Sequence, residues 1–123
     1  MTKTPLTQEQ FEQYFNEITN FCNSMLCSKN KEYAPDTDKL SNFRSAGEFT
    51  GQDEKVVLFG YMLKHWDSIK TMILSGKNYP TEQWREKIAD SINYLIILYS
   101  MIKEDMKSQA CYERDESSEK VSE

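Results

Sequence analysis

The chain has 123 residues, which matches one domain by the usual length of roughly 100 to 200 residues per domain. Hydrophobic residues make up 38% and charged residues 28%, so the composition excludes a low-complexity chain. The formal charge of −5 argues against general nucleic-acid binding, because contacts with phosphate backbones need a surplus of Lys and Arg. No apolar run approaches the roughly 20 residues that span a bilayer, so we expect a cytoplasmic protein without membrane contact.

A first helix is predicted from residue 8 to about residue 29. Thr7 and Gln10 have the spacing of a side-chain pair that satisfies the free amides at a helix start. Apolar residues then recur at steps of three and four, which places them on one helical face. We expect this face to belong to the core; it comprises Phe11, Tyr14, Phe15, Ile18, Phe21, Cys22, Met25 and Leu26.

Residues 30–52 are predicted to form a long loop. Pro35, Gly47 and Gly51 interrupt the helical periodicity, and one helical turn is expected near residues 39–46. Loops of this length are uncommon in compact domains unless they carry function. The segment is therefore a candidate for a functional role.

A second helix is predicted over residues 53–74, with Asp53 and Glu54 at its positive end and Gly76 just past its stop. Residues 56–63 contain no charged side chain, so this half shows apolar groups on every side. We expect it to be buried all round. A third helix is predicted from a cap at Thr81 to about residues 103–105, and its residues 94–99 again leave no polar side.

One chain with three helices cannot cover both segments that carry apolar groups on every side, residues 56–63 and residues 94–99. We therefore expect an all-α bundle of three to four helices that a homo-oligomer, a dimer or a tetramer, completes. Residues 1–105 form a single domain in this prediction. Residues 106–123 are charged, Ser-rich and aperiodic, so a disordered acidic tail is expected there.

Three acidic residues are spaced by four on the third helix: Glu82, Glu86 and Asp90. This spacing places them along one helical line, which Asn93 continues. The line leads toward a face that we expect to be covered, and buried carboxylates need a cation. Mg²⁺ prefers a few carboxylates together with waters and phosphates. The alternative is a solvated acidic face.

The second helix carries three further candidates. Lys64 lies away from the main apolar stripe, so it either pairs with a carboxylate such as Asp67 or binds an anion such as phosphate. Gly60 in mid-helix costs about 1 kcal/mol relative to Ala, which indicates a close helix contact or the approach of a ligand. His65 is interpreted as a packing residue in preference to a metal ligand or a general base.

Four segments occur in a characteristic order: "KNKEY", "LSNF", "MLKHWDSI" and "WREKIADSINYL". In this order, the chain from residue 8 to residue 105 resembles small phage-encoded helical proteins similar to the MazG-like all-α nucleoside triphosphate pyrophosphohydrolases. The resemblance implies a helical oligomer, in the cytoplasm of a phage-infected host cell, that binds a nucleotide near its helix interfaces. Mg²⁺, with Mn²⁺ as an alternative, would hold the phosphates. Water would attack to give a nucleoside monophosphate and pyrophosphate.

The resemblance also implies roles for single residues. Glu86 and Asp90 match the catalytic acidic pair, and Glu82 stands one turn earlier as a further metal ligand. Segment 29–43 would be a lid over the nucleotide, whereas the plainer interpretation is an ordinary polar loop. The nucleotide-binding residues would be Lys29, Asn30, Glu32, Tyr33, Asn42, Phe43, Lys64 and Asn93.

The chain departs from that family in one respect. The enzymes carry a Glu-Glu-x-x-Glu cluster on an earlier helix, and this sequence has none. Three hypotheses follow. The chain is a metal-dependent hydrolase, a nucleotide-binding protein without turnover that sequesters a modified or signalling nucleotide from host defence, or a protein-interaction inhibitor whose acidic face mimics nucleic acid.

Overall fold

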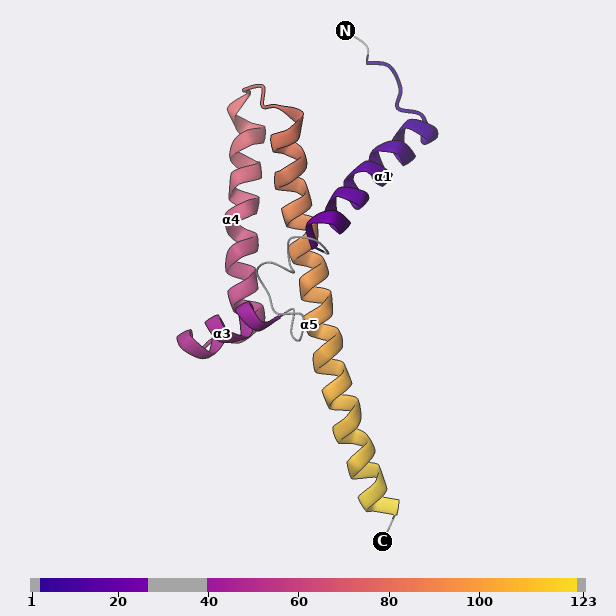
Figure 1. Cartoon of the computed structure of the whole chain (residues 1–123), viewed down its shortest axis with the longest axis vertical. Helices are drawn as coiled ribbons and strands as arrows, with labels where there is room; N and C mark the ends of the chain where they lie inside the picture. The colour runs from indigo at the N-terminus through magenta and orange to yellow at the C-terminus, as the bar shows by residue number, and fades with distance from the viewer. Residues whose placement is uncertain (1–2, 27–39, 122–123) are drawn as a thin grey trace.

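The computed structural model describes residues 3–26 and 40–121, with side chains up to residue 110. These residues form the helices α1 (Gln8–Ser24), α3 (Ser41–Thr50), α4 (Glu54–Ser75) and α5 (Thr81–Val121) and no strand, which confirms the all-α prediction. α4 and the first half of α5 run antiparallel as a hairpin, the end of α1 meets the part of α5 that contains Arg85 and Ala89, and α3 lies beside the start of α4 (Figure 1). None of the described helices combines the length and apolar composition that crossing a membrane requires.

The start of α1 is where the sequence predicts it. The Gln10 amide donates to the Thr7 hydroxyl at 3.1 Å, and the Thr7 amide donates to the Gln10 side chain at 3.5 Å. These reciprocal bonds satisfy two of the amides that a helix start leaves free. The predicted end near residue 29 lies outside the described residues.

Within the described residues, the buried contacts of α1 lie in its second half, which packs against α5. Cys22 is buried with its thiol 3.9 Å from the carbonyl oxygen of Ala89, and the Arg85 guanidinium lies 4.4 Å above the Phe21 ring. Burial is the main cause that raises the pKa of the Cys22 thiol, and the charge of Asp90 adds to it. The prediction that the whole apolar face of α1 is core is wrong within one chain, because its first half, with Phe11, Tyr14 and Phe15, is exposed.

α3 occupies part of the segment that the sequence predicts to be a loop. The expected single turn is a helix of ten residues, and Gly51 ends it in the left-handed region at φ 72°. The Gln52 amide then donates to the Gly47 carbonyl at 2.9 Å. A Cβ at Gly47 would lie 2.6 Å from the Gln52 carbonyl oxygen, so the close turn requires glycine. The two glycines therefore close a helix and do not mark a structureless loop.

The hairpin helices follow the prediction at three of their four ends. The Asp53 carboxylate accepts from the Lys55 amide at 2.8 Å at the start of α4, and Gly76, at φ 68°, follows its end. Thr81 is the first residue of α5 and not its predicted cap. The helix end predicted near residues 103–105 is wrong, because α5 continues to Val121. The disordered acidic tail expected over residues 106–123 stays a prediction. After Pro80 the sequence contains no Gly or Pro, so no residue interrupts the helical backbone.

The buried core of the described residues is small. Leu40, Leu58, Met62 and Met101 form one cluster, in which Leu58 and Met101 are 0% exposed. The apolar side chains of residues 56–63, which we expected to be buried all round, are partly exposed in one chain: Val56, Phe59, Tyr61 and Leu63.

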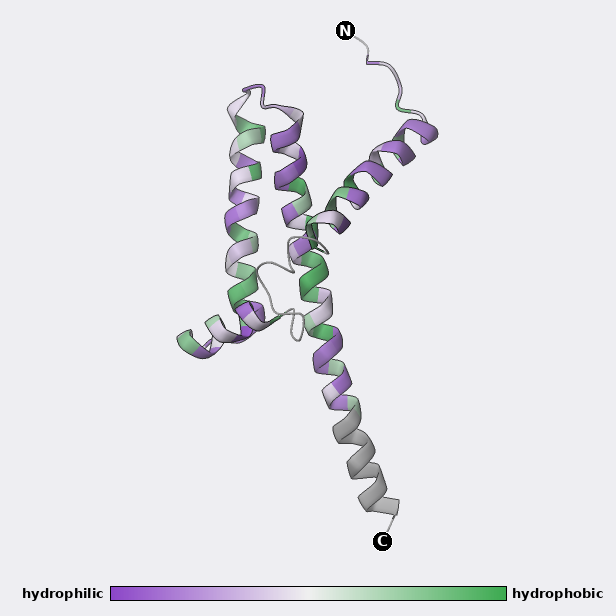
Figure 2. Ribbon diagram, viewed as in Figure 1, coloured by the Kyte–Doolittle hydropathy of each residue, from purple (hydrophilic) through white to green (hydrophobic). Residues whose placement is uncertain are grey.

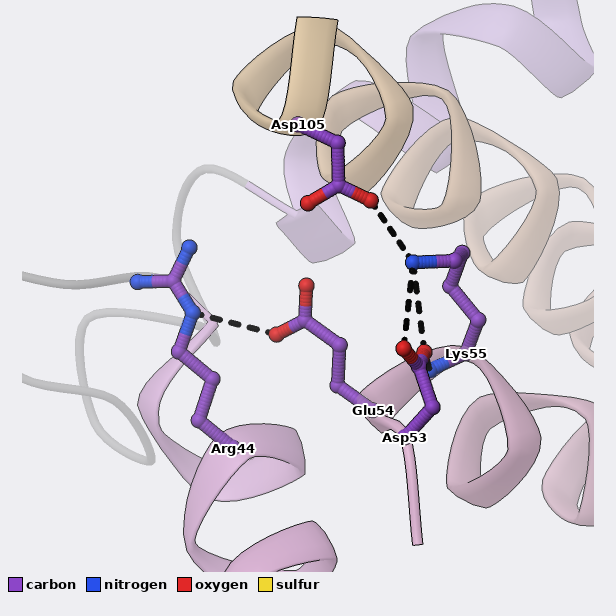
Figure 3. Close-up of polar contacts among 5 residues, drawn as sticks. All are labelled: Arg44, Asp53, Glu54, Lys55 and Asp105. Atoms are coloured by element: carbon purple, nitrogen blue, oxygen red, sulfur yellow. Dashed lines mark hydrogen bonds and ion pairs between the residues drawn. The ribbon is translucent and has the colours of Figure 1, made fainter. Parts of the chain in front are cut away.

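Ion pairs connect α3 and α5 to the first turn of α4 (Figure 3). The Lys55 ammonium lies 2.7 Å from an Asp105 carboxylate oxygen and 3.2 Å from Asp53. Arg44 lies 3.0 Å from Glu54. These pairs hold the helices at the end of the hairpin where α3 meets the core.

Candidate functional site

Three aromatic rings from three helices meet beside the core. The ring of Phe43 on α3 meets the ring of Tyr61 on α4 edge-on, with centroids 5.9 Å apart. The Tyr61 ring lies 6.2 Å from that of Tyr94 on α5, at an interplanar angle of 14°. With Asn42 and Ile97 these rings line a cavity of about 270 Å³, which we call the aromatic cavity. Aromatic walls with one amide suit a flat ring that carries polar edges.

A row of polar groups extends from the aromatic cavity. The Tyr94 hydroxyl lies 3.3 Å from Nε2 of His65, whose ring centroid is 5.1 Å from that of Tyr94. On the other side of the imidazole, Nδ1 lies 3.9 Å from Oδ2 of Asp90. Nδ1 is buried and makes no hydrogen bond, although buried polar atoms ordinarily have a partner. Tyr94, His65 and Asp90 form what we call the polar row.

The phenol of Tyr94 is neutral at physiological pH. Burial is the main cause that raises its pKa above the ordinary value, and the charge of Asp90 and the neighbouring Tyr61 add to the shift. A neutral phenol can donate to Nε2 of His65 or accept from it, and the direction depends on the imidazole tautomer. In the tautomer to which Tyr94 donates, the imidazole proton is on Nδ1, which lies 3.9 Å from Oδ2 of Asp90.

Asn93, three residues after Asp90 on α5, has a buried side-chain oxygen. The residue is 6% exposed, and its amide nitrogen donates to the Met25 sulfur at 4.0 Å. Its Oδ1 has no hydrogen-bond partner, which costs about 1 to 3 kcal/mol for a buried polar atom. An oxygen in this state suits a ligand donor or a cation.

The three acidic residues spaced by four at the start of α5 differ in their surroundings. Glu82 and Glu86 are exposed, whereas Asp90 is half-buried. Residues four apart on a helix rise by about 6 Å, so Glu82 and Asp90 are separated by about 12 Å along the axis and cannot both bind one ion at the roughly 2.1 Å of a Mg²⁺ bond. The described residues contain no group of three His, Cys, Asp or Glu that holds a metal. The magnesium site stays a prediction, and Glu86 with Asp90 is the pair that fits it.

Lys64 lies on a neighbouring surface. It is exposed and lines a wider groove of about 620 Å³ together with Gly60 and Tyr61. Tyr61 lines both this groove and the aromatic cavity, so the two adjoin. Among the described residues outside the neighbouring backbone of α4, no atom lies within 4 Å of a Cβ built at Gly60, so no close helix contact in this part of the chain requires the glycine.

The fold brings together only some of the described site residues that we predicted. Asn42 and Phe43 line the aromatic cavity, and Asp90 belongs to the polar row that adjoins it. Four residues of the expected lid lie outside the described residues: Lys29, Asn30, Glu32 and Tyr33. Sequence reasoning missed Tyr61 and Tyr94 and interpreted His65 as a packing residue. Their signal was the spacing of four from Tyr61 to His65 and from Asp90 to Tyr94, which aligns each pair on one helical face.

Comparisons of the chain with protein-family models, with curated proteins and with solved structures give no match. The site is therefore interpreted from its own chemistry. It offers aromatic faces, one half-buried carboxylate, an imidazole that faces this carboxylate, and a lysine on the adjoining groove.

Proposed function

We propose that the chain binds a nucleotide in the aromatic cavity and hydrolyses a nucleoside triphosphate to the monophosphate and pyrophosphate with Mg²⁺. One observation supports this proposal most: the ring of Tyr94 lines the aromatic cavity while its hydroxyl leads through His65 toward the half-buried Asp90. Stacking of a base on an aromatic side chain contributes about 1 to 3 kcal/mol, and every base has a face for it. Asn42 adds an amide for the polar edge of a base or sugar.

The polar row supplies the groups for hydrolysis in this proposal. Bound Mg²⁺ would neutralise phosphate charge, with Glu86 and Asp90 holding it. The Asp90 carboxylate accepts a proton from a water, whose oxygen bonds to the α phosphorus. The bond from that phosphorus to its bridging oxygen breaks, and pyrophosphate leaves with the electron pair. With its proton on Nδ1, His65 would orient the Asp90 carboxylate, from which Nδ1 lies 3.9 Å, and the Tyr94 hydroxyl, 3.3 Å from Nε2, would fix the imidazole.

Chromatography of the products tests turnover. The full chain is incubated with Mg²⁺ and a panel of ribo- and deoxyribonucleoside triphosphates, beside Asp90→Asn and the matched control Asp67→Asn, whose exposed carboxylate lies on α4. We expect monophosphate and pyrophosphate from the wild type and the control, and a loss of at least a hundredfold in Asp90→Asn, since general bases typically contribute about 10² to 10⁴ in rate. Unchanged turnover in Asp90→Asn removes the polar row from the mechanism.

A second candidate function is nucleotide binding without turnover. The observation that favours it is the exposure of Glu82 and Glu86, which leaves Asp90 as the half-buried carboxylate of the three. Such a protein would sequester a modified or signalling nucleotide in a phage-infected cell. Nucleotide that raises the melting temperature by mass action while it stays intact supports this candidate. Absence of both effects favours the protein-interaction inhibitor.

We propose separately that the chain forms a homo-oligomer, because the apolar side chains of Val56, Phe59 and Leu63 are about half exposed in one chain.

A further inference from the structure

α1 and the start of α5 enclose a further pocket. The two helices meet at Arg85 and Ala89 of α5 and diverge toward their starts (Figure 1). The space between them is a pocket of about 390 Å³, which we call the α1/α5 pocket. Its lining includes Tyr14, Glu17 and Ile18 of α1 and Trp84, Arg85 and Ile88 of α5. None of these residues lines the aromatic cavity, so the two sites have different walls.

Much of the lining of the α1/α5 pocket is apolar, with two isoleucines and the rings of Tyr14 and Trp84. Figure 2 shows that hydrophobic residues gather where α1 meets α5, whereas both helices are largely hydrophilic toward their starts. The Tyr79 ring meets the Trp84 ring edge-on, with centroids 6.0 Å apart, and supports it. Pockets for small molecules have volumes of about 300 to 1,000 Å³, so this one suits a small ligand with an apolar body.

One cation in the pocket lacks a counter-charge. Arg85 is partly buried, and its guanidinium carbon lies 4.4 Å from the centre of the Phe21 ring, which holds the group in place. Its Nε is buried without a hydrogen-bond partner, and no ion pair within the described residues involves Arg85. A charge that is withdrawn from water ordinarily has a partner of opposite charge. Because a guanidinium matches a carboxylate through two parallel N–H bonds, the pocket suits a carboxylate ligand.

A carboxylate lies one helical turn away on α1. Glu17 lines the pocket and is exposed, and it forms no ion pair with Arg85 in the described part of the chain. It precedes Phe21 by four residues, which is a rise of about 6 Å along α1 from the ring under the guanidinium. A ligand in the pocket therefore meets one negative and one positive group. The charge of Glu17 disfavours phosphates and favours a ligand that carries a cation beside its carboxylate.

We propose that the α1/α5 pocket binds a free α-amino acid with a large apolar side chain. The Arg85 guanidinium binds its carboxylate, and the Glu17 carboxylate binds its ammonium group. The apolar side chain of the ligand packs between Tyr14 and Trp84. This site is distinct from the proposed nucleotide site, and its test needs neither nucleotide nor Mg²⁺.

Calorimetric titration of the full chain with L-phenylalanine tests the proposal. Phenylpropionate, which lacks the ammonium group, and phenethylamine, which lacks the carboxylate, are titrated beside it. Three variants are compared with the wild type: Arg85→Met, the control Lys87→Met on the same helix but outside the pocket, and Phe43→Leu in the aromatic cavity.

We expect the wild type to bind phenylalanine more tightly than either analogue. Affinity should fall by about tenfold or more in Arg85→Met, because a hydrogen-bonded charge is lost, and should stay unchanged in Lys87→Met and Phe43→Leu. The proposal is overturned by a wild type that does not bind phenylalanine or binds phenylpropionate equally well. Unchanged affinity in Arg85→Met, or a loss in Phe43→Leu, also overturns it.

A further variant covers the case in which Arg85→Met fails to fold without its contact to Phe21. Glu17→Gln changes an exposed side chain and leaves the packing of α1 intact. We expect it to bind phenylalanine several-fold more weakly than the wild type does, while phenylpropionate binds as well or better because a repulsive charge is gone. A preference for phenylalanine that is undiminished in Glu17→Gln contradicts the proposed recognition of the ammonium group.

Discussion

Tyr94 connects the two parts of the candidate site at the scale of single residues. Its ring lines the aromatic cavity, and its hydroxyl lies 3.3 Å from the imidazole that faces Asp90. A substitution by Phe removes the hydroxyl and keeps the ring. It therefore separates the contribution of the polar row from that of stacking.

Tyr94→Phe is expected to alter the stability of the protein at alkaline pH. The pKa of Tyr94 is raised in the folded chain, chiefly by burial, so the folded state favours the neutral phenol. Its contribution is complete below the unfolded value of about 10 and is lost as the pH rises through the folded value. Urea unfolding between about pH 9 and pH 11 measures this, and the wild type should lose more stability than Tyr94→Phe. Parallel losses in both proteins would show that the folded state does not favour the neutral form.

Some residues of the site could be predicted from the sequence and others could not. Phe43 and Asp90 were singled out because their neighbours in the sequence form recognisable segments. His65 was interpreted as a packing residue, since periodicity shows the face on which a residue lies but not which polar group faces it. Its partners, Tyr94 and Asp90, belong to another helix.

At the scale of the elements, local sequence signals predicted the helix starts more accurately than the helix ends. Thr7, Asp53 and Gly76 act through their own neighbours, so α1 and α4 begin or end where predicted. The full length of α3 was not predicted, because Gly47 and Gly51 are typical of loops. In the structure these two glycines form the turn that ends the helix. α5 runs past its predicted end because loss of apolar periodicity is a weaker stop signal than a Gly or Pro.

The pair between Lys55 and Asp105 tests how α4 is held against α5 (Figure 3). Both side chains are partly solvent-exposed, so we expect a coupling free energy of about 0.2 to 1 kcal/mol in a double-mutant cycle with Lys55→Ala and Asp105→Ala. The coupling should decrease in high salt because ions screen it. Unfolding in urea measures each corner of the cycle. A coupling near zero in low salt would mean that apolar packing alone fixes this end of the hairpin.

At the scale of the whole molecule, the hairpin presents two different surfaces. One surface brings the aromatic cavity together with the polar row, and a second holds an apolar groove of about 480 Å³ between α4 and α5. The sequence predicted that the helices need a covering partner, because residues 56–63 carry apolar groups on every side. It did not predict that Val56 and Phe59 line both this apolar groove and the groove with Lys64, since α3 had first to be placed against α4.

Calorimetric titration with nucleoside triphosphates in the presence of Mg²⁺ tests the nucleotide site most directly. The wild type is compared with Phe43→Leu, which keeps an apolar side chain in the cavity wall but removes the ring, and with Phe49→Leu on the exposed side of the same helix. Loss of one stacking ring should weaken binding by about tenfold in Phe43→Leu, which corresponds to about 1.4 kcal/mol, and Phe49→Leu should bind as the wild type does. Equal affinity in all three proteins, or a wild type that binds none of the nucleotides, would contradict a nucleotide site in the aromatic cavity.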